Sequence, residues 1–211
     1  MNVTANRTIL ADLMGVVANV VNKRHSTPIL QQVLFDASSD GLVLYGTDNE
    51  LSIQQRVPEV SVKTPGRVLL SAQMLTGLLR DLRSETVTFS TEGDQVLVSA
   101  GEDTIRLQST DPEGFPSFPS LDQAEKVVLS ASQVDAALGR TGKSVAVDKG
   151  RYALNGVLLT PSDGKVEFCG TDGRRLAYVC IETDAKAIKA QVILPRRGIE
   201  MLQKLAQRLD G

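Results

Sequence analysis

Basic side chains gather in one segment of an otherwise acidic protein. Residues 139–151 include one acid and four cations, namely Asp148, Arg140, Lys143, Lys149 and Arg151. Cations close together in a sequence can bind a polyanion, because they bring several positive charges to neighbouring phosphates. The pattern fits a nucleic acid as partner, and it fits equally well charges that serve only solubility.

Charge is divided unevenly along the chain. Residues 1–124 carry 9 basic and 15 acidic side chains, whereas residues 125–211 carry 14 basic and 10 acidic ones. Between residues 85 and 125, Arg106 is the only cation beside nine acids. The net charge of −2 therefore hides a second half that can present a positive face.

Residues typical of catalysis or metal binding are sparse. His25 is the only histidine, and no glycine-rich phosphate loop, carboxylate pair or metal-ligand spacing stands out. Cys169 and Cys180 lie in apolar strand-like segments, which predicts buried free thiols rather than a disulfide or a zinc site. We therefore expect a protein that is not an enzyme and that holds no metal and no cofactor.

The composition is that of an ordinary globular protein. Hydrophobic residues make up 42% of the chain and charged residues 23%. No apolar run approaches the roughly 20 residues that a membrane span needs, and the first residues lack the pattern of a signal peptide. We expect a cytoplasmic protein without a membrane partner.

One pattern occurs twice in the sequence. Residues 33–35 (VLF) and 45–48 (YGTD) recur 124 positions later, at 157–159 (VLL) and 169–172 (CGTD). This spacing fits a duplicated domain of roughly 100 to 150 residues and is too long for a solenoid repeat. We therefore predict two units of one fold. Under the same shift, the second unit stops at Gly211, before the counterparts of three strands of the first.

Hydrophobic periodicity predicts helices and strands in the first unit. Apolar residues at three- and four-residue spacings predict one helix over 7–21 and a second, capped by Ser71, that ends at residue 82. Strands are predicted at 33–37, 42–47, 51–57, 67–70, 86–90, 95–100 and 104–108. The first unit is therefore expected to belong to the α+β class.

The second unit follows residues 111–119, the segment richest in proline and glycine, so we place the boundary near residue 122. The predicted domains are 1–122 and 123–211. Strands are expected at 126–130, 154–160, 166–169, 176–181 and 192–194. One helix should be capped by Ser132, and a last helix should span 199–209 with Pro195 in its first turn.

Six phrases of the sequence resemble the beta subunit of bacterial DNA polymerase III, the sliding clamp family. They stand in order and at matching intervals, at residues 27–30, 46–48, 115–116, 151–156, 171–176 and 195–198. The resemblance covers the whole chain and implies an α+β DNA-clamp fold with pore-lining helices and outer sheets. It implies a processivity factor that encircles duplex DNA as a ring-shaped homodimer. The chain would supply a complete domain one and a domain two without its last three strands.

The resemblance also implies residues that contact DNA without reading its sequence. These are Arg24, Lys149, Arg151, Tyr152 and Arg196. A tyrosine beside cations can stack on a base or a sugar while the cations contact phosphate, and an arginine at the start of a helix suits a phosphate. Ala153 departs from the family pattern, in which a second aromatic residue follows the tyrosine.

Partner proteins of the family insert a linear peptide motif into a groove at the edge of the second domain. The residues that match it here are Leu154, Thr171, Gly173, Arg174, Arg175 and Leu176. Arg174 stands where the best-known relatives have histidine. Taken without the resemblance, residues 171–173 are a turn between strands, and the two leucines face the core by alternation.

Ring closure in the family pairs the edge of the first domain with another domain. The matching edge here comprises Met74, Leu78, Ile105 and Leu107. The implied partners are double-stranded DNA, DNA polymerase III, the clamp loader and a second copy of the chain. The alternative is a protein-interaction scaffold that has a clamp-like fold and no role on DNA.

Overall fold

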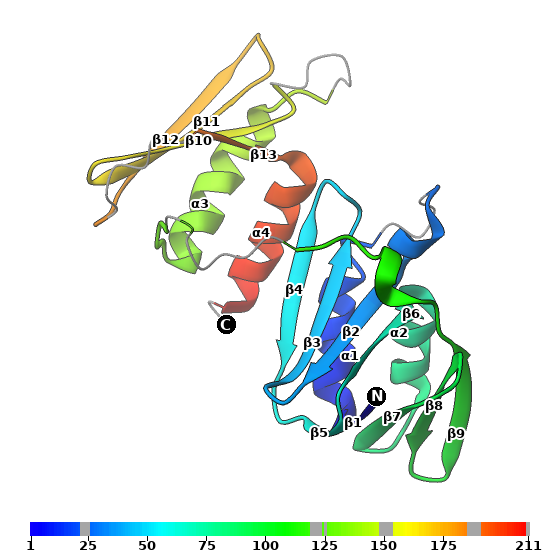
Figure 1. Ribbon diagram of the computed structural model, residues 1–211. Coiled ribbons are helices and arrows are strands. Elements are labelled where there is room, and N and C mark those ends of the chain that lie inside the picture. Colours follow the sequence, from blue (N-terminus) through cyan, green and yellow to red (C-terminus); the bar gives the residue numbers. More distant parts are fainter. Residues whose placement is uncertain (22–25, 119–123, 125, 148–153, 185–190, 210–211) are drawn as a thin grey trace. The chain divides into compact units, whose positions relative to one another are not determined.

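The computed structural model describes residues 1–21, 26–118, 124, 126–147, 154–184 and 191–209 (Figure 1). The chain divides into two compact units, Met1–Pro119 and Ser120–Gly211. The predicted boundary near residue 122 lies outside the described residues. None of the described helices is both long and apolar enough to cross a membrane.

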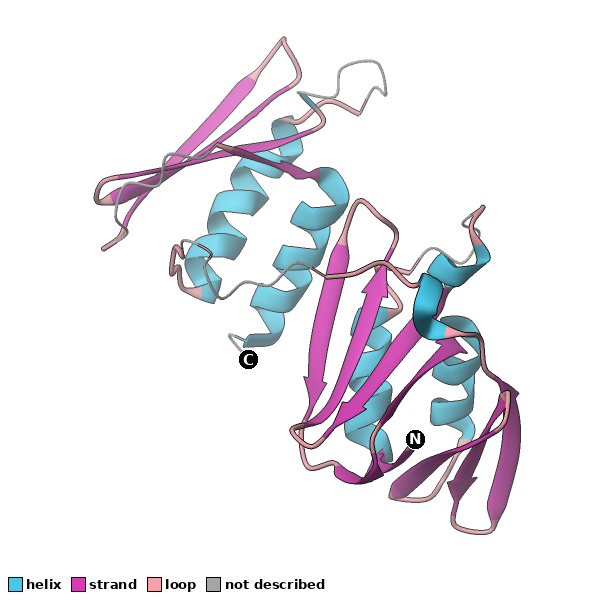
Figure 2. Ribbon diagram, in the orientation of Figure 1, coloured by secondary structure: helices cyan, strands magenta, loops and turns pink. Residues whose placement is uncertain are grey.

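The described part of the first unit combines two helices with two antiparallel sheets (Figure 2). The helices are α1 (Arg7–Val17) and α2 (Ala72–Asp81), and two 3-10 turns are η1 (Pro28–Gln31) and η2 (Pro112–Gly114). One sheet has the order β4-β3-β2-β6, and the other has the order β5-β1-β7-β8-β9. The strands are β1 (Asn2–Asn6), β2 (Gln32–Ser38), β3 (Gly41–Thr47), β4 (Ser52–Val57), β5 (Ser61–Thr64), β6 (Gly66–Ser71), β7 (Thr86–Glu92), β8 (Gln95–Ala100) and β9 (Asp103–Gln108).

In its described residues, the second unit has one antiparallel sheet of order β12-β11-β10-β13, covered on one face by two helices (Figure 1). Its strands are β10 (Gly156–Ser162), β11 (Lys165–Thr171), β12 (Leu176–Glu182) and β13 (Val192–Pro195). Its helices are α3 (Ala131–Thr141) and α4 (Arg196–Leu209), and the 3-10 turn η3 (Gly142–Ser144) follows α3.

The two units repeat one arrangement, as the sequence predicts. The shift of 124 positions that relates the sequences also carries α1 onto α3 and the sheet β4-β3-β2-β6 onto β12-β11-β10-β13. Strand register is kept as well, since the pair Leu34 and Tyr45 corresponds to the pair Leu158 and Cys169. The α+β fold class is confirmed.

One glycine in each unit lets a helix approach the sheet closely. A Cβ atom on Gly46 would lie 2.6 Å from Cγ1 of Val17, at the end of α1. A Cβ atom on Gly170, its counterpart, would lie 2.3 Å from the carbonyl oxygen of Thr141, at the end of α3. Real Cβ atoms do not come so near to other heavy atoms. The glycine of the repeated Gly-Thr-Asp phrase is therefore required for packing.

The predicted strand at 126–130 is wrong. Its counterpart in the first unit is β1, which pairs with both β5 and β7. Among the described residues of the second unit, no strand takes the place of β5 or β7, and residues 126–130 pair with no described strand. A strand exists through its ladder partners, which explains both this error and the failure to predict β1 and β5 from local pattern.

Several element ends also differ from the prediction. Helix α1 ends at Val17 rather than at residue 21. Helix α3 is capped by Ser130, not by Ser132, in a capping box with Gln133. Helix α4 starts at Arg196, and Pro195 belongs to β13. The predicted cap of α2 is confirmed, because the side chain of Ser71 accepts a hydrogen bond from the backbone N–H of Met74.

We predict opposite effects for two glycine-to-alanine substitutions. Gly77 lies within α2, and a Cβ atom there would meet nothing within 4 Å. Gly77→Ala should raise the free energy of unfolding by about 0.5–1 kcal/mol, because alanine favours the helix. Gly46→Ala should lower it by roughly 1–3 kcal/mol, because the added methyl group collides with α1. Urea unfolding of both variants measures this, and a gain in Gly46→Ala would contradict the packing argument.

Candidate functional site

The Thr-Asp phrase forms the same turn in both units. In the second unit, Asp172 Oδ1 accepts hydrogen bonds from the backbone N–H groups of Arg174 and Arg175, each at 3.0 Å. The hydroxyl of Thr171 donates to the carbonyl oxygen of Arg175 at 2.7 Å and accepts from the N–H of Gly173 at 3.1 Å. The side chains of Thr171 and Asp172 thus satisfy the backbone of the turn, which accords with the structural reading of residues 171–173.

Equivalent contacts hold the turn of the first unit. Asp48 Oδ1 accepts from the N–H groups of Glu50 and Leu51 at 3.1 and 2.8 Å. Asn49 has a φ angle of 70° and Gly173, its counterpart, a φ angle of 86°, so both lie in the left-handed region. The repeated phrase is therefore explained by turn geometry in both units.

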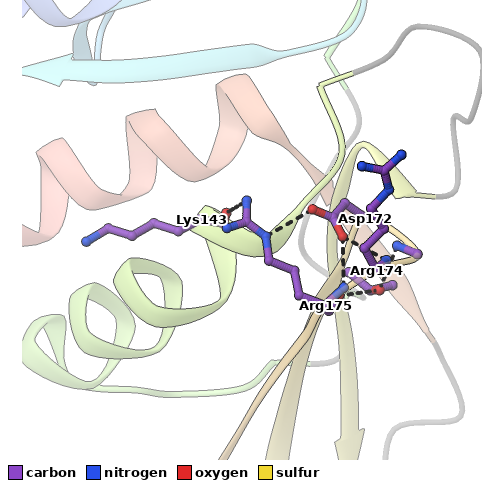
Figure 3. A network of polar contacts seen from close by, with 6 residues as sticks. Lys143, Asp172, Arg174 and Arg175 are labelled. Atoms are coloured by element: carbon purple, nitrogen blue, oxygen red, sulfur yellow. Dashed lines mark hydrogen bonds and ion pairs between the residues drawn. The ribbon is translucent and has the colours of Figure 1, made fainter.

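Arg175 ties the turn of the second unit to the end of the helix layer. Its Nε atom lies 2.9 Å from Asp172 Oδ2, and its guanidinium donates to the carbonyl oxygen of Lys143 at 2.7 Å (Figure 3). The side chain of Arg174 points away from Asp172 and is exposed (Figure 3). Of the two arginines predicted for the groove, Arg175 thus holds the turn against η3, whereas the charge of Arg174 is exposed to solvent.

The prediction that both leucines face the core is wrong for Leu176. Its side chain is 66% exposed, whereas Leu154 is half-buried. Every residue at 176–181 is apolar or aromatic, so alternation cannot decide which face is buried. In the structure, Val179 and Ile181 pack against the core, and the opposite parity is exposed. Cys180 shares that parity and is an exposed free thiol rather than a buried one.

Four of the five residues predicted to contact DNA lie outside the described residues. These are Arg24, Lys149, Arg151 and Tyr152, and Ala153 lies there too. The fifth, Arg196, is the first residue of α4 and forms an exposed ion pair of 3.3 Å with Glu200. An exposed pair of this kind holds the arginine only weakly. Arg196 can therefore exchange its partner for a phosphate.

The helices of the second unit carry further exposed cations that the prediction for DNA contacts left out. Together with Arg196, the cations of α3, η3 and α4 whose burial is described and which are exposed are Arg140, Lys143, Arg197 and Lys204. Arg197 and Lys204 are seven residues apart, which places them on one face of α4 and could have been read from the sequence. In the first unit, by contrast, the guanidinium of Arg7 is engaged by the carbonyl oxygens of Ser84 and Leu79.

The predicted dimer edge includes both exposed and covered residues. Strand β9 ends its sheet, and Met74 on α2 is 59% exposed. Leu107 is buried, and Ile105 and Leu78 are half-buried. At this edge the free groups are therefore the backbone of β9 and the side chain of Met74.

Comparison with known proteins bears on both units. Residues 1–119 match the model of the DNA polymerase III beta subunit, N-terminal domain, and residues 128–211 match that of its central domain. The chain belongs to the DNA polymerase III beta subunit family. These matches cover more than half of the chain and confirm the resemblance that the six phrases indicate.

Individual relatives and solved structures agree with the family. The beta sliding clamps of Chlamydia pneumoniae and Pseudomonas aeruginosa are each 30% identical, over 97% and 100% of this chain and 56% and 58% of the relative. The P. aeruginosa beta subunit structure has a TM-score of 0.92 at 29% identity, covering 100% of this chain and 58% of that one. The Bacillus subtilis sliding clamp shares the fold, with a TM-score of 0.93 at 22% identity over 97% and 56%. The chain thus spans a little over half the length of these members of the beta subunit family.

The stability that the turn of the second unit contributes should be lost in acid. The backbone N–H groups of Arg174 and Arg175 hold the pKa of Asp172 below its ordinary value of 3.8. A lowered pKa contributes stability that is complete above the unfolded value and is lost as the pH falls through the folded one. Carbon-13 NMR titration should therefore place the Asp172 carboxyl below 3.8, and a midpoint at or above that value would contradict the turn geometry.

A matched pair of variants tests the same point by stability. Asp172→Asn should lower the free energy of unfolding at neutral pH. The difference in this free energy between the variant and the parent protein should be smaller in acid, because Asp172 of the parent is then uncharged as well. Asp163→Asn is the control, since Asp163 is an exposed acid between β10 and β11.

Proposed function

We propose that this chain is part of a processivity clamp, a protein that encircles duplex DNA and tethers the replicative polymerase without catalysing a reaction. Membership of the DNA polymerase III beta subunit family supports the proposal. The observation that carries it is the set of five exposed cations on α3, η3 and α4, defined above. On the same helices, the described acids are Asp135 and Glu200, so the surface is positive.

The charge suits a contact with DNA that does not depend on sequence. Asp135 accepts hydrogen bonds from the amides of Gln203 and Gln207, and Glu200 pairs with Arg196. Both acids are thus engaged within the helix layer. Arginine and lysine heads on helices can meet phosphates along a duplex without reading bases. We propose that Arg24, Lys149, Arg151 and Tyr152 contribute to the same contact.

We further propose a peptide groove and a dimer edge. The groove would receive a linear motif of DNA polymerase III or of the clamp loader. Its residues are the exposed Leu176 and Arg174, the half-buried Leu154, and Thr171 and Gly173 of the turn. The free edge of β9 and the exposed Met74 would join another copy of the chain in a ring. We propose a cytoplasmic location, in keeping with a role in replication.

Loss of cations on α4 should weaken duplex binding in a measurable way. The plot of log affinity against log salt has a negative slope, to which each phosphate contact contributes about 0.9. Arg197→Ala combined with Lys204→Ala should therefore make this slope less steep by about 2. Fluorescence anisotropy with a labelled duplex measures the slope. The control removes two exposed cations from the sheet β5-β1-β7-β8-β9, by Lys63→Ala with Arg106→Ala, and should leave the slope unchanged. Duplex binding without salt dependence would favour the scaffold alternative.

A second experiment tests encirclement. The native protein that contains this chain is loaded on nicked circular DNA, and the complex is washed in high salt. Retention on the circle followed by loss after linearisation is expected, because a ring slides off a free end. Equal retention on both forms would mean that the hold is chemical, and the clamp proposal would fail.

A further inference from the structure

The internal repeat relates helix α2 of the first unit to helix α4 of the second. The shift of 124 positions carries Ala72, the first residue of α2, onto Arg196, the first residue of α4. The same shift carries Gln73 and Arg80 onto Arg197 and Lys204, the two cations that share one face of α4. The first unit therefore keeps a cation at one of these two positions and has an amide at the other.

Arg80 is a free cation of the first unit. It is exposed in the last turn of α2 and forms no hydrogen bond or ion pair with any described residue. Gln73 is exposed as well, and because it lies seven residues before Arg80, both project from one face of the helix. The guanidinium and the amide can therefore reach the same ligand.

A hollow of about 340 Å³ lies between α2 and the residues that follow α1. Gln73, Thr76, Gly77 and Arg80 line one side of it, and Ala18 and Val21 line the other. Gly77 keeps the hollow open, because a Cβ atom there would meet nothing within 4 Å. Met201 holds the equivalent position of α4. The first unit thus has a space beside its cation where the second unit has a side chain.

The lining of the hollow suits an anion. None of the described residues that line it is acidic. The hydroxyl of Thr76 donates to the carbonyl oxygen of Ala72 at 2.7 Å, so the guanidinium of Arg80 and the amide of Gln73 remain as donors. Arginine binds phosphate oxygens with a planar set of N–H groups, and the apolar wall of Ala18 and Val21 suits a sugar. The hollow therefore has the chemistry for a sugar-phosphate unit.

We propose that this hollow binds one phosphate of the backbone of duplex DNA, with Arg80 as its cation and Gln73 as a further donor. The proposal rests on the proposed function and adds the first unit to the surface that contacts DNA. One cation beside a neutral amide balances the single charge of a phosphodiester. Free inorganic phosphate carries more charge at neutral pH and would need a second cation. The contact positions the duplex and reads no base.

The salt dependence of duplex binding tests the role of Arg80. In the fluorescence anisotropy assay, Arg80→Ala should make the slope of log affinity against log salt less steep by about 0.9. Gln73→Arg, which copies Arg197 of the second unit, should make it steeper by about 0.9. Arg83→Ala is the control and should leave the slope unchanged, because Arg83 is an exposed cation that does not line the hollow. Equal effects of Arg80→Ala and Arg83→Ala would overturn the proposal.

A second pair of variants tests the hollow itself. Gly77→Met copies Met201 of the second unit and should fill the space, which lowers the affinity for the duplex about fivefold through loss of the hydrogen bond from Gln73. Gly15→Met is the control, since Gly15 also has nothing within 4 Å of its Cβ position and does not line the hollow. An unchanged affinity of Gly77→Met would overturn the proposal.

The source of the phosphate is tested by NMR. The duplex should shift the amide signals of Gly77 and Arg80 in the nitrogen-15-labelled chain, and inorganic phosphate at the same concentration should not. Equal shifts with inorganic phosphate would indicate a site for a free anion and would overturn the proposal. If Arg197→Ala with Lys204→Ala changes the salt slope and Arg80→Ala does not, this inference fails and the clamp proposal stands. If neither variant changes the slope, both fail.

Discussion

Both units depend on one contact, in which two antiparallel helices bury their apolar stripes against one face of an antiparallel sheet. In the second unit, Val157 and Phe168 of the sheet are buried against Leu138 and Ile199 of the helices. This burial of apolar surface is the main term that stabilises such a layered unit. It also determines which surfaces remain free. In the second unit, the outer side of the helices and the outer side of the sheet are two broad faces that this burial leaves exposed.

The two units use these free faces differently. In the second, cations such as Arg197 and Lys204 occupy the helix face, and apolar residues such as Ile193 occupy the sheet face. In the first, the sheet face is closed by Phe115, and Arg7 is engaged at the end of α2. The two faces of the second unit therefore differ in character, and a helix layer and a sheet lie between them.

Sequence reasoning predicts well where a signal is local or repeated. The duplication, the cap at Ser71 and the Thr-Asp turns depend on residues near in sequence. It fails where the decisive partner is distant. Residues 126–130 have strand-forming side chains, but no strand among the described residues pairs with them. The burial of Leu176 could not be decided because its neighbours on both faces are apolar. The hydrogen bond from Arg175 to the carbonyl oxygen of Lys143 joins residues 32 positions apart in the sequence, and no periodic pattern of the sequence indicates this bond.

The most direct test of this account is to map where duplex DNA contacts the chain. Amide signals of the nitrogen-15-labelled protein are followed while a short duplex is added at low salt. The account predicts shifts in residues 131–147 and 196–207, the helix layer of the second unit, which reverse as salt is raised. Signals of β7, β8 and β9 should stay in place, because residues 85–108, which contain these strands, carry five acids and one cation. Shifts centred on those strands, with the helices unchanged, would contradict the assignment of the helix layer to DNA.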